Sequence, residues 1–375
     1  MKYIGYYVLY NSKVKRSHIT SAVNKIKYML KSFSKAYDKV DVFSVSRNLE
    51  NKYRIFSSET ISEGNINLHH PLSWGGKGKI HTHIMYKWMS ICLFFYLLFK
   101  AKKGEHVYVY HSTAYGNSVL WAKALKKFKL ILEVEEIYSD VQKHNPNLRK
   151  YENSHFEAAD AFILSTNLLN DIVNKNNKPY VVINGTYEVE ELVSKKVNDG
   201  KTHIVYAGTF DIRKGSSVAA VSAAEYLDEN YVIHICGFGK KEDEEALKEL
   251  IQKNNTTNTC KIVFHGLLKG YEYISFLQSC HIGLSTQNPD GDFNATSFPS
   301  KILSYLANGL SVVSIKIPAI VQSEVGDCIS YYEEQTPMAI AAAIKNASLN
   351  EDYRNVVMRL SDNFDKNVVD FKNFI

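Results

Sequence analysis

Glycines and basic residues follow predicted strands between residues 203 and 315, where strand gives way to helix. In the first of these turns Gly208 is followed by Arg213 and Lys214, and in the last Lys301 stands in the first turn of a helix. A diphosphate needs backbone N–H donors, which a helix N-terminus supplies, and fixed positive charge. Lysine provides a compact charge and arginine a two-pronged one. Because open α/β sheets bind ligands at the carboxyl ends of their strands, the pattern predicts a diphosphate site there.

Neighbouring turns predict the rest of a nucleotide site. Gly237, Phe238 and Gly239 end one apolar strand, and Leu267 follows the next strand. We expect the backbone at these turns to hold the base and the ribose. On the side of Lys301, the amides and hydroxyls of the preceding residues are expected to bind the diphosphate. These residues are Ser297, Phe298, Pro299 and Ser300.

The order of these segments resembles that in GT-B glycosyltransferases of family 4, the glycosyl transferases group 1 type. The resemblance covers most of residues 200–320, in the right order, whereas residues 1–200 match only in general plan. It implies an α/β fold with two Rossmann-like doubly wound domains facing a central cleft. It also implies hexosyl transfer from a nucleoside diphosphate sugar, UDP- or GDP-linked, with retention of anomeric configuration and no cofactor beyond the donor.

Several positions depart from the family pattern. Thr209 stands where the family has an arginine, and Thr296 and Ser304 stand where it has two glutamates eight residues apart. Asp290 and Asp292, just upstream, are candidates to replace the missing contact to the donor sugar. The alternative for these aspartates is a plain Gly/Asp surface turn. The departures keep open a catalytically silent GT-B protein that acts as a partner or glycan-binding subunit.

The expected mechanism is stabilisation of a leaving group. Negative charge builds on the diphosphate as the anomeric bond breaks, and preorganised cations and N–H groups lower that barrier by a few kcal/mol for each well-placed donor. We assign Arg213 and Lys214 to one side of the diphosphate and Lys301 to the other. With these cations in place no divalent metal is required. The paired histidines at 69–70 and at 81 and 83 lack the carboxylate or cysteine spacing of a metal site.

Three residues of the first half are candidates for the catalytic side of the cleft. His111 follows a predicted strand, where relatives of the family carry a histidine near the donor sugar, and Glu135 with Glu136 follows the next strand. A carboxylate at such a position can bind sugar hydroxyls or accept the proton of the attacking hydroxyl. The alternatives are a hydrogen-bonded structural histidine and acidic residues that favour a helix N-terminus.

Alternating strands and helices must position these residues. Strands are predicted at 3–10, 40–45, 106–110, 130–134, 161–165 and 180–183, and helices at 17–36, 84–100, 116–127, 150–158 and 167–175. Such alternation indicates parallel sheets with helices on both faces. Residues 64–78 are predicted to form a long loop that contacts the acceptor.

The chain divides into three parts on this pattern. We expect an acceptor-binding domain at 1–190 and a nucleotide-sugar-binding domain at 191–350. Residues 351–375 carry apolar residues at helical spacing and are expected to form a helix that crosses back to the first domain. Five cysteines without Cys-x-x-Cys spacing indicate buried thiols in a reducing compartment. Together with the lack of a signal-peptide pattern at the start, they favour a cytoplasmic protein.

Charge is divided unevenly between the halves. Residues 1–132 contain 22 Lys and Arg but 6 Asp and Glu, a net charge of +16 in a chain whose total is +6. Such a domain is attracted to anionic surfaces. No helix-turn-helix, zinc-finger or RNP-like pattern accompanies it, which argues against nucleic acid. The expected partners are therefore the donor, a glycan or lipid-linked acceptor, and an anionic membrane surface.

One apolar segment makes the membrane prediction specific. Residues 88–99 form an uncharged run followed by lysines at 100, 102 and 103. The run is too short to cross a bilayer, which needs about 20 residues. Trp88 and the lysines suit a helix lying in the interface, peripheral to the inner face of the membrane. The alternative is an ordinary buried helix.

Overall fold

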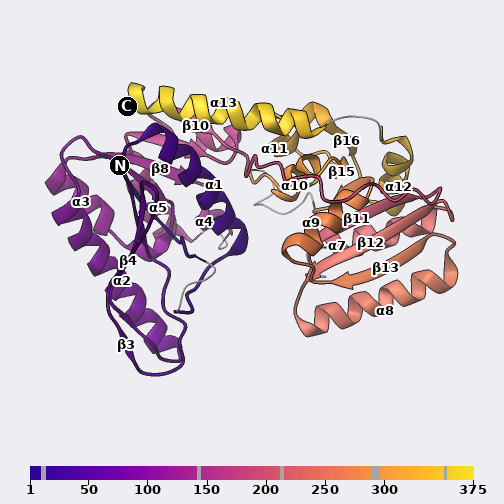
Figure 1. The fold of residues 1–375 in the computed structure, drawn as a ribbon, viewed down its shortest axis with the longest axis horizontal. Helices are drawn as coiled ribbons and strands as arrows, with labels where there is room; N and C mark the ends of the chain where they lie inside the picture. The colour runs from indigo at the N-terminus through magenta and orange to yellow at the C-terminus, as the bar shows by residue number, and fades with distance from the viewer. Residues whose placement is uncertain (10–13, 142–144, 212–214, 289–295, 350–352) are drawn as a thin grey trace. The chain divides into compact units, whose positions relative to one another are not determined.

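The computed structural model describes residues 1–9, 14–141, 145–211, 215–288, 296–349 and 353–375. The chain forms two compact units. Unit 1 comprises Met1–Asn184 and Asn363–Ile375, and unit 2 comprises Gly185–Asp362. Figure 1 shows the strands and helices of both units.

Unit 1 is built on an eight-stranded sheet in the order β10-β9-β8-β7-β1-β2-β5-β4. All neighbours run parallel except the pair β4 and β5. The strands are β1 (Lys2–Gly5), β2 (Val40–Ser44), β4 (Glu59–Glu63), β5 (Ile66–His70), β7 (His106–Tyr110), β8 (Lys129–Val134), β9 (Ala161–Leu164) and β10 (Tyr180–Val182). Because parallel sheets are covered on both faces, their strands are buried throughout, as β1, β2 and β9 are.

Helices follow most of these strands in the chain. They are α1 (Thr20–Ala36), α2 (Lys79–Lys100), α3 (Ser118–Lys126), α4 (Tyr138–Val141), α5 (Pro146–Ala158) and α6 (Asn170–Val173), with 3-10 turns at Thr113–Tyr115 and Asn167–Leu169. The start of α5 is determined locally, because Asn145 accepts hydrogen bonds from the amides of Asn147 and Leu148 while Pro146 occupies the first turn.

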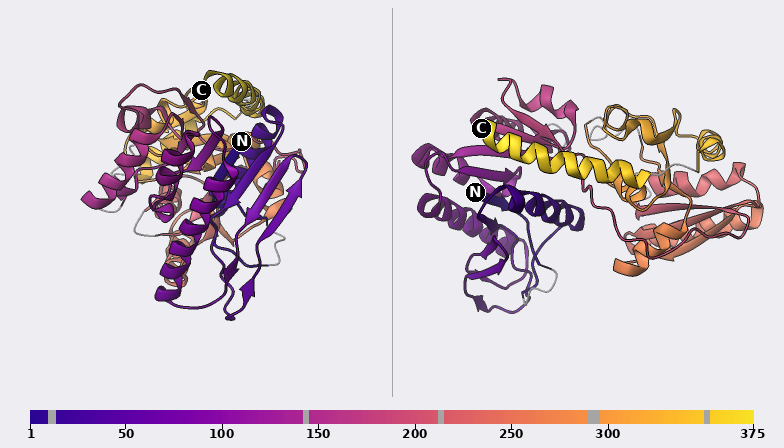
Figure 2. Two further views of the ribbon diagram at one scale, coloured as in Figure 1. Left: turned by 90° about the vertical axis from the view of Figure 1, so that its left-hand side faces the viewer. Right: turned by 45° about the horizontal axis from the view of Figure 1, so that its top comes forward.

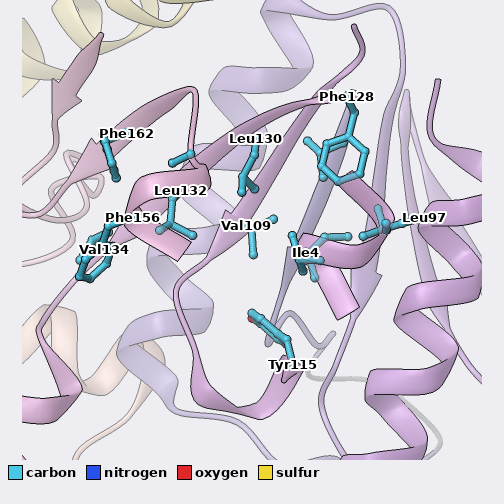
Figure 3. Packing of buried hydrophobic residues seen from close by; sticks show 14 of the residues in the cluster. Ile4, Leu97, Val109, Tyr115, Phe128, Leu130, Leu132, Val134, Phe156 and Phe162 are labelled. Carbon is cyan, nitrogen blue, oxygen red and sulfur yellow. The ribbon is translucent and has the colours of Figure 1, made fainter. Parts of the chain in front are cut away.

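The core of unit 1 lies between its sheet and the helices α2, α3 and α5 (Figure 3). Ile4 and Val109 come from neighbouring strands, and Leu97 comes from the inner face of α2. All three side chains are fully buried. Figure 3 also shows Phe128, just before β8, in the same layer. This core fixes the strand ends that carry the polar residues described below.

The prediction of a long loop at residues 64–78 is wrong for two parts of that segment, residues 66–70 and 73–74, which form strands. Ile66–His70 is β5, which pairs with β2 on one side and with β4 on the other. Ser73–Trp74 is β6, which pairs with β3 (Ile55–Phe56) in a separate two-stranded sheet. The first strand also ends earlier than predicted, at Gly5. Glycine and histidine suggested a loop here, but the sheet supplies backbone partners that outweigh local propensity.

Unit 2 contains a six-stranded parallel sheet in the order β13-β12-β11-β14-β15-β16. Its strands are β11 (Thr202–Thr209), β12 (Tyr231–Phe238), β13 (Lys261–Gly266), β14 (Ile282–Ser285), β15 (Ser311–Ile315) and β16 (Ile329–Tyr332). Its helices are α7 (Ser216–Ser222), α8 (Lys241–Thr257), α9 (Gly270–Ser279), α10 (Lys301–Ala307), α11 (Pro318–Val321) and α12 (Pro337–Asn346), with 3-10 turns at Ala223–Tyr226 and Gly326–Cys328. Figure 2 shows helices packed outside the strands.

The C-terminal helix α13 (Tyr353–Phe374) is shared between the two units, since unit 1 takes its residues from Asn363 onward. Phe364 stacks on Tyr28 of α1, with 5.7 Å between the ring centroids. Lys372 donates a hydrogen bond to the carbonyl oxygen of Ala36 at 2.7 Å. The last turns of the chain are therefore packed into unit 1.

Candidate functional site

The strand order of unit 2 defines where a ligand is expected. Counted along the chain, the order is 3-2-1-4-5-6, in which the direction of winding reverses between β11 and β14. Open α/β sheets bind ligands outside the carboxyl ends of the strands at such a point. There β11 ends at Thr209 and β14 ends at Ser285. The Thr286 hydroxyl donates to the carbonyl oxygen of Ser216 at 2.6 Å, which ties the start of α7 to the end of β14.

The ends of β11 and β12 approach each other closely at Gly208 and Gly237. A Cβ atom on Gly237 would lie 1.7 Å from the Gly208 carbonyl oxygen. Gly237 also has a φ of +143°, which other residues rarely adopt. The end of β12 therefore requires glycine at residue 237. Bare backbone is what a ligand phosphate can approach closely.

The side chain of Tyr305 holds α10 across the same region. Its hydroxyl oxygen accepts a hydrogen bond from the backbone N–H of Ala207 in β11 at 2.8 Å. Its ring lies directly on Gly283 of β14, where a Cβ atom would lie 2.3 Å from ring carbons. Lys301, one turn before Tyr305 on α10, is thereby fixed over the carboxyl end of β11.

Lys301 has an unusual environment for a lysine. Its Nζ lies over the ring of Tyr206, 4.3 Å from the centroid, and 3.0 Å from where a Cβ of Gly208 would stand. Within the described residues no carboxylate forms an ion pair with it. Burial lowers the pKa of the Lys301 ammonium to about 8, because desolvation disfavours the charged form. A partly desolvated cation beside bare glycine backbone is a binding group for an anion.

The other predicted donor-binding residues lie at the same edge of the sheet or in the segment before α10. Phe238, which ends β12, and Leu267, which follows β13, are exposed, as are Thr209 and Ser300, whereas Phe298 is buried. Ser304 is half-buried on α10. Gly239, Thr296 and Ser297 lie in the turns that flank these residues. Arg213, Lys214, Asp290 and Asp292 lie outside the described residues.

Unit 1 has its own reversal of strand order, between β1 and β7. His111 and Ser112 follow β7, and both are buried. The Tyr6 hydroxyl and the Ser112 hydroxyl form a hydrogen bond of 2.7 Å across the gap between the two strands. The Tyr151 hydroxyl donates to the carbonyl oxygen of Ser112 at 2.9 Å. Tyrosines thus surround the end of β7.

The imidazole of His111 is held in place by Glu152. The two side chains meet at 3.0 Å between Nε2 and Oε1, and both are buried. Burial favours the neutral form of Glu152, but hydrogen bonds from His111 and Ser139 outweigh it and lower the pKa of the carboxyl. The hydrogen bond to Glu152 therefore fixes the orientation of the His111 ring at the end of β7. Such a bond is also what the alternative given above, a hydrogen-bonded structural histidine, predicts.

Glu135, after β8, is bound by Lys25 of α1 at 2.5 Å, and Lys25 also donates to the carbonyl oxygen of Ile183 at 2.9 Å. Two residues before it, Glu133 is completely buried and accepts a hydrogen bond from the Tyr3 hydroxyl at 2.5 Å. Burial, and then the neighbouring charge of Glu135, raise the pKa of Glu133 to about 8. The end of β8 thus carries one lysine-paired carboxylate and one carboxylic acid that is mostly protonated at neutral pH.

The sequence did not single out Glu133, Tyr206 or Tyr305. A lone glutamate inside the apolar strand at 129–134 was a signal that could have identified Glu133, because an unpaired buried charge is costly. Tyr206 and Tyr305 carried no such signal. Their roles depend on contacts between β11 and α10, which are about a hundred residues apart, as the separation of 98 between Ala207 and Tyr305 shows.

Comparison with known proteins indicates the class of protein to which this fold and site correspond. Residues 188–364 match the family of glycosyl transferases group 1. No curated protein matches the chain at a significant level. Among solved structures, the sucrose-phosphate synthase of Thermosynechococcus elongatus aligns with a TM-score of 0.69 at 14% identity, covering 100% of this chain and 98% of its own.

Two further structures align over almost the whole length of both chains. The UDP-forming α,α-trehalose-phosphate synthase of Burkholderia xenovorans, in complex with glucose-6-phosphate, aligns with a TM-score of 0.65 at 12% identity, covering 98% of this chain and 99% of that one. An E. coli structure titled trehalose-6-phosphate and bound with UDP-2-fluoro glucose has the same TM-score at 10% identity, covering 100% and 97%. At these identities the likeness concerns the fold.

The chain therefore has the GT-B fold, with two Rossmann-like α/β units, as predicted from its sequence. Its residues 188–364 match the glycosyl transferases group 1 family, a family of transferase enzymes. The family resemblance drawn from the turns of the second half is confirmed.

Proposed function

We propose that the protein transfers a hexosyl group from a UDP- or GDP-linked sugar to a hydroxyl acceptor. The acceptor is a lipid-linked or polysaccharide glycan in bacterial surface glycan synthesis, and transfer retains the anomeric configuration. The enzyme works in the cytoplasm at the inner face of the membrane. The observation that carries the donor part of this proposal is Lys301, a cation fixed over the reversal point of the unit 2 sheet beside bare glycine backbone.

Lys301 supplies what the chemistry of a diphosphate leaving group needs. Its ammonium is already desolvated and held by α10, so little reorganisation is required as charge builds on the diphosphate. Arg213 and Lys214 of the β11–α7 turn are proposed for the opposite side. The region of Phe238 at the end of β12 and of Leu267 after β13, two exposed residues, is proposed for the base and the ribose.

The glycan acceptor is proposed to approach unit 1 at the carboxyl ends of β7 and β8. His111 is proposed to lie near the donor sugar, and Glu135 to bind or deprotonate the attacking hydroxyl. Tyrosine rings and carboxylates, which gather at these strand ends, are the side chains that stack on and hydrogen-bond to sugars. The similar structures bound with UDP-2-fluoro glucose and with glucose-6-phosphate support a sugar donor linked to a nucleoside diphosphate and a sugar acceptor.

Substitution of Lys301 tests the donor site. Lys301→Met keeps the length of the side chain but removes its charge, and we expect donor turnover to fall about 100-fold, since one such donor is worth about 3 kcal/mol. The matched control is Lys241→Met, at a lysine whose side chain is 87% exposed on α8. Turnover would be measured as release of nucleoside diphosphate. An undiminished rate in Lys301→Met would remove the assignment.

A second candidate function follows from the departures at the donor site. Thr209, Thr296 and Ser304 replace an arginine and two glutamates of the family pattern. These residues favour a catalytically silent protein that binds a partner transferase or a glycan. Hydrolysis or transfer of any nucleotide sugar by the purified chain would exclude this candidate, and identification of the product's anomer by NMR would then test retention.

A further inference from the structure

Unit 1 exposes an apolar face on two neighbouring helices, α2 and α3 (Figure 1). The rings of Phe94 on α2 and Trp121 on α3 meet edge to face, with 6.5 Å between their centroids. Ser90 and Ser118 add a hydrogen bond of 3.3 Å between the same helices. The exposed side chains of this α2–α3 face are Ile84, Ile91, Phe95 and Phe99 of α2 and Trp121 and Leu125 of α3.

The exposure of this face is large for such side chains. Phe99 is 73% exposed, Trp121 is 61% exposed and Leu125 is 63% exposed. The residues of α2 recur at intervals of seven, four and four, so they form one stripe along the helix. Phe95 and Phe99 stack on each other, which makes the stripe continuous. Contiguous apolar patches of this kind mark interaction surfaces.

The opposite side of α2 is already used by the core of unit 1. Met85, Met89, Leu93 and Leu97 are buried there. Among the described residues α2 is the one helix whose length and composition would allow it to cross a membrane, which by itself is weak evidence. A helix whose inner side belongs to the core of its own domain cannot leave that core to span a bilayer without unfolding it. The outer side of α2 can therefore contact a membrane only by lying along the surface of the bilayer.

Charge indicates the nature of that surface. Between Glu63 and Glu133 the sequence contains a single acidic residue, Glu105, together with ten lysines. Glu105 is compensated by the N-terminal ammonium at 3.6 Å and by Lys2 at 3.3 Å. Four lysines at or just after the C-terminal ends of α2 and α3 are exposed, namely Lys100, Lys102, Lys103 and Lys127. An apolar face with lysines at its edge is complementary to a lipid bilayer whose acyl chains are apolar and whose headgroups are anionic.

We propose that the α2–α3 face docks on an anionic lipid bilayer, with α2 lying along the interface and Trp121 inserted at the level of the headgroups. The proposal rests on the proposed function, because it supplies the surface on which a lipid-linked acceptor is presented. Trp88, which the sequence suggested as the anchor, is already engaged. Its Nε1 donates to the carbonyl oxygen of Leu72 at 2.7 Å, and its ring packs on Trp74. The anchoring tryptophan is instead contributed by α3.

Flotation of the full-length protein with lipid vesicles tests the docking. We expect binding to vesicles of phosphatidylcholine with phosphatidylglycerol, little binding to phosphatidylcholine alone, and weaker binding at high salt because the charges are screened. Phe95→Ser with Trp121→Ser should weaken binding about tenfold or more, from the lost apolar burial. Lys100→Glu with Lys103→Glu should weaken it at least about 25-fold, at about fivefold for each charge removed.

Matched changes in unit 2 serve as controls. Met338→Ser removes an apolar side chain that is 62% exposed, and Lys241→Glu reverses an exposed lysine. Both should bind vesicles as the unchanged protein does, and all variants should keep the same melting temperature and donor turnover.

Three results would overturn the docking proposal. One is no binding to anionic vesicles at low salt, and another is equal loss of binding in the control variants. The third is a dimer in light scattering that Phe95→Ser with Trp121→Ser dissociates, since the face would then be covered by a second copy. If the protein turns over the donor but does not bind vesicles, the docking proposal is wrong and the proposed function stands. If it binds vesicles but takes up no donor, the proposed function is wrong and the docking proposal stands.

Discussion

Lys301 and Glu133 are two ionisable side chains whose protonation is set by burial. Lys301 has its pKa lowered to about 8 and Glu133 has its pKa raised to about 8, in each case first by desolvation. Each lies at the carboxyl end of a central strand, one in each unit. At neutral pH the lysine is therefore mainly charged and the glutamic acid mainly neutral. A modest rise in pH above neutral would therefore deprotonate both Lys301 and Glu133.

Donor affinity should depend on pH through Lys301. The diphosphate binds the protonated ammonium, so affinity should be constant near pH 6.5 and should fall as pH rises through about 8, by up to tenfold per pH unit. Calorimetric titration with UDP between pH 6.5 and 9.5 measures this. Lys301→Arg should flatten the profile, because a guanidinium stays protonated. A flat profile in the unchanged protein would contradict the prediction.

Stability should depend on pH through Glu133. Its pKa is higher in the folded protein than in the unfolded chain, so the folded state holds a proton that the unfolded state releases. This contribution is fully favourable below about pH 4.5 and is lost progressively as pH rises towards about 8. Glu133→Gln keeps a neutral side chain of the same shape. Its melting temperature relative to the unchanged protein should rise from pH 5 to pH 8, and a constant difference would refute the assignment.

At the scale of elements, the close approach of β11 and β12 is the feature on which the donor site depends. The two strands pair in register up to Gly208 and Gly237 and on to Thr209 and Phe238. Glycine at both strand ends brings the two turns together, and Tyr305 then holds α10 over them. A change in this small region should therefore affect both stability and donor binding.

Gly237→Ala should destabilise unit 2 by about 2–4 kcal/mol, since a methyl group there meets the Gly208 carbonyl and the backbone is strained. Urea denaturation measures the change. Gly200→Ala is the matched control, because Gly200 also has a positive φ, of +82°, but a Cβ there would have nothing within 4 Å. It should cost only about 1 kcal/mol from backbone strain. Equal effects of the two changes would show that the close approach is unimportant.

At the scale of the whole molecule, each unit has its own sheet, core and reversal of strand order. The net charge of +16 on residues 1–132, within a total of +6, leaves −10 on the rest of the chain. The basic residues thus concentrate in the unit that carries the exposed apolar face, while the lysine proposed for the donor lies in the other unit. Donor binding and surface docking are assigned to separate units and can be tested separately.

Nucleotides should stabilise the part of the molecule that contains unit 2. A ligand at 100 times its dissociation constant adds about 2.7 kcal/mol to the free energy of unfolding. In differential scanning calorimetry, UDP or GDP should raise the transition that includes unit 2, and the nucleotide that raises it at lower concentration identifies the donor base. A protein that responds to neither, nor to other nucleotides, would contradict the donor site.

Sequence order predicted the alternation of strands and helices well, because apolar strands and amphipathic helices have local signatures. Of the apolar residues predicted near the C-terminus, Val357, Leu360, Phe364 and Val368 are buried along α13. The segment at 64–78 was misjudged because β5 is stabilised by its neighbours β2 and β4 rather than by its own composition. In the candidate site, the sequence identified the glycines and Lys301 as residues that follow strands. It did not predict the burial of Lys301 or the close approach of Gly208 and Gly237.

The amino-acid sequence by itself determined the class of fold, the order of the turns and the presence of a cation after the last of them, since each depends on residues close together in the chain. Only the tertiary structure decided that Lys301 stands over Tyr206 with no ion-pair partner among the carboxylates of the described residues, that Tyr305 spans two strands, and that Glu133 is buried beside Tyr3. It also decided which side of α2 the core covers. These properties depend on desolvation and on contacts between distant segments, and no local pattern encodes them.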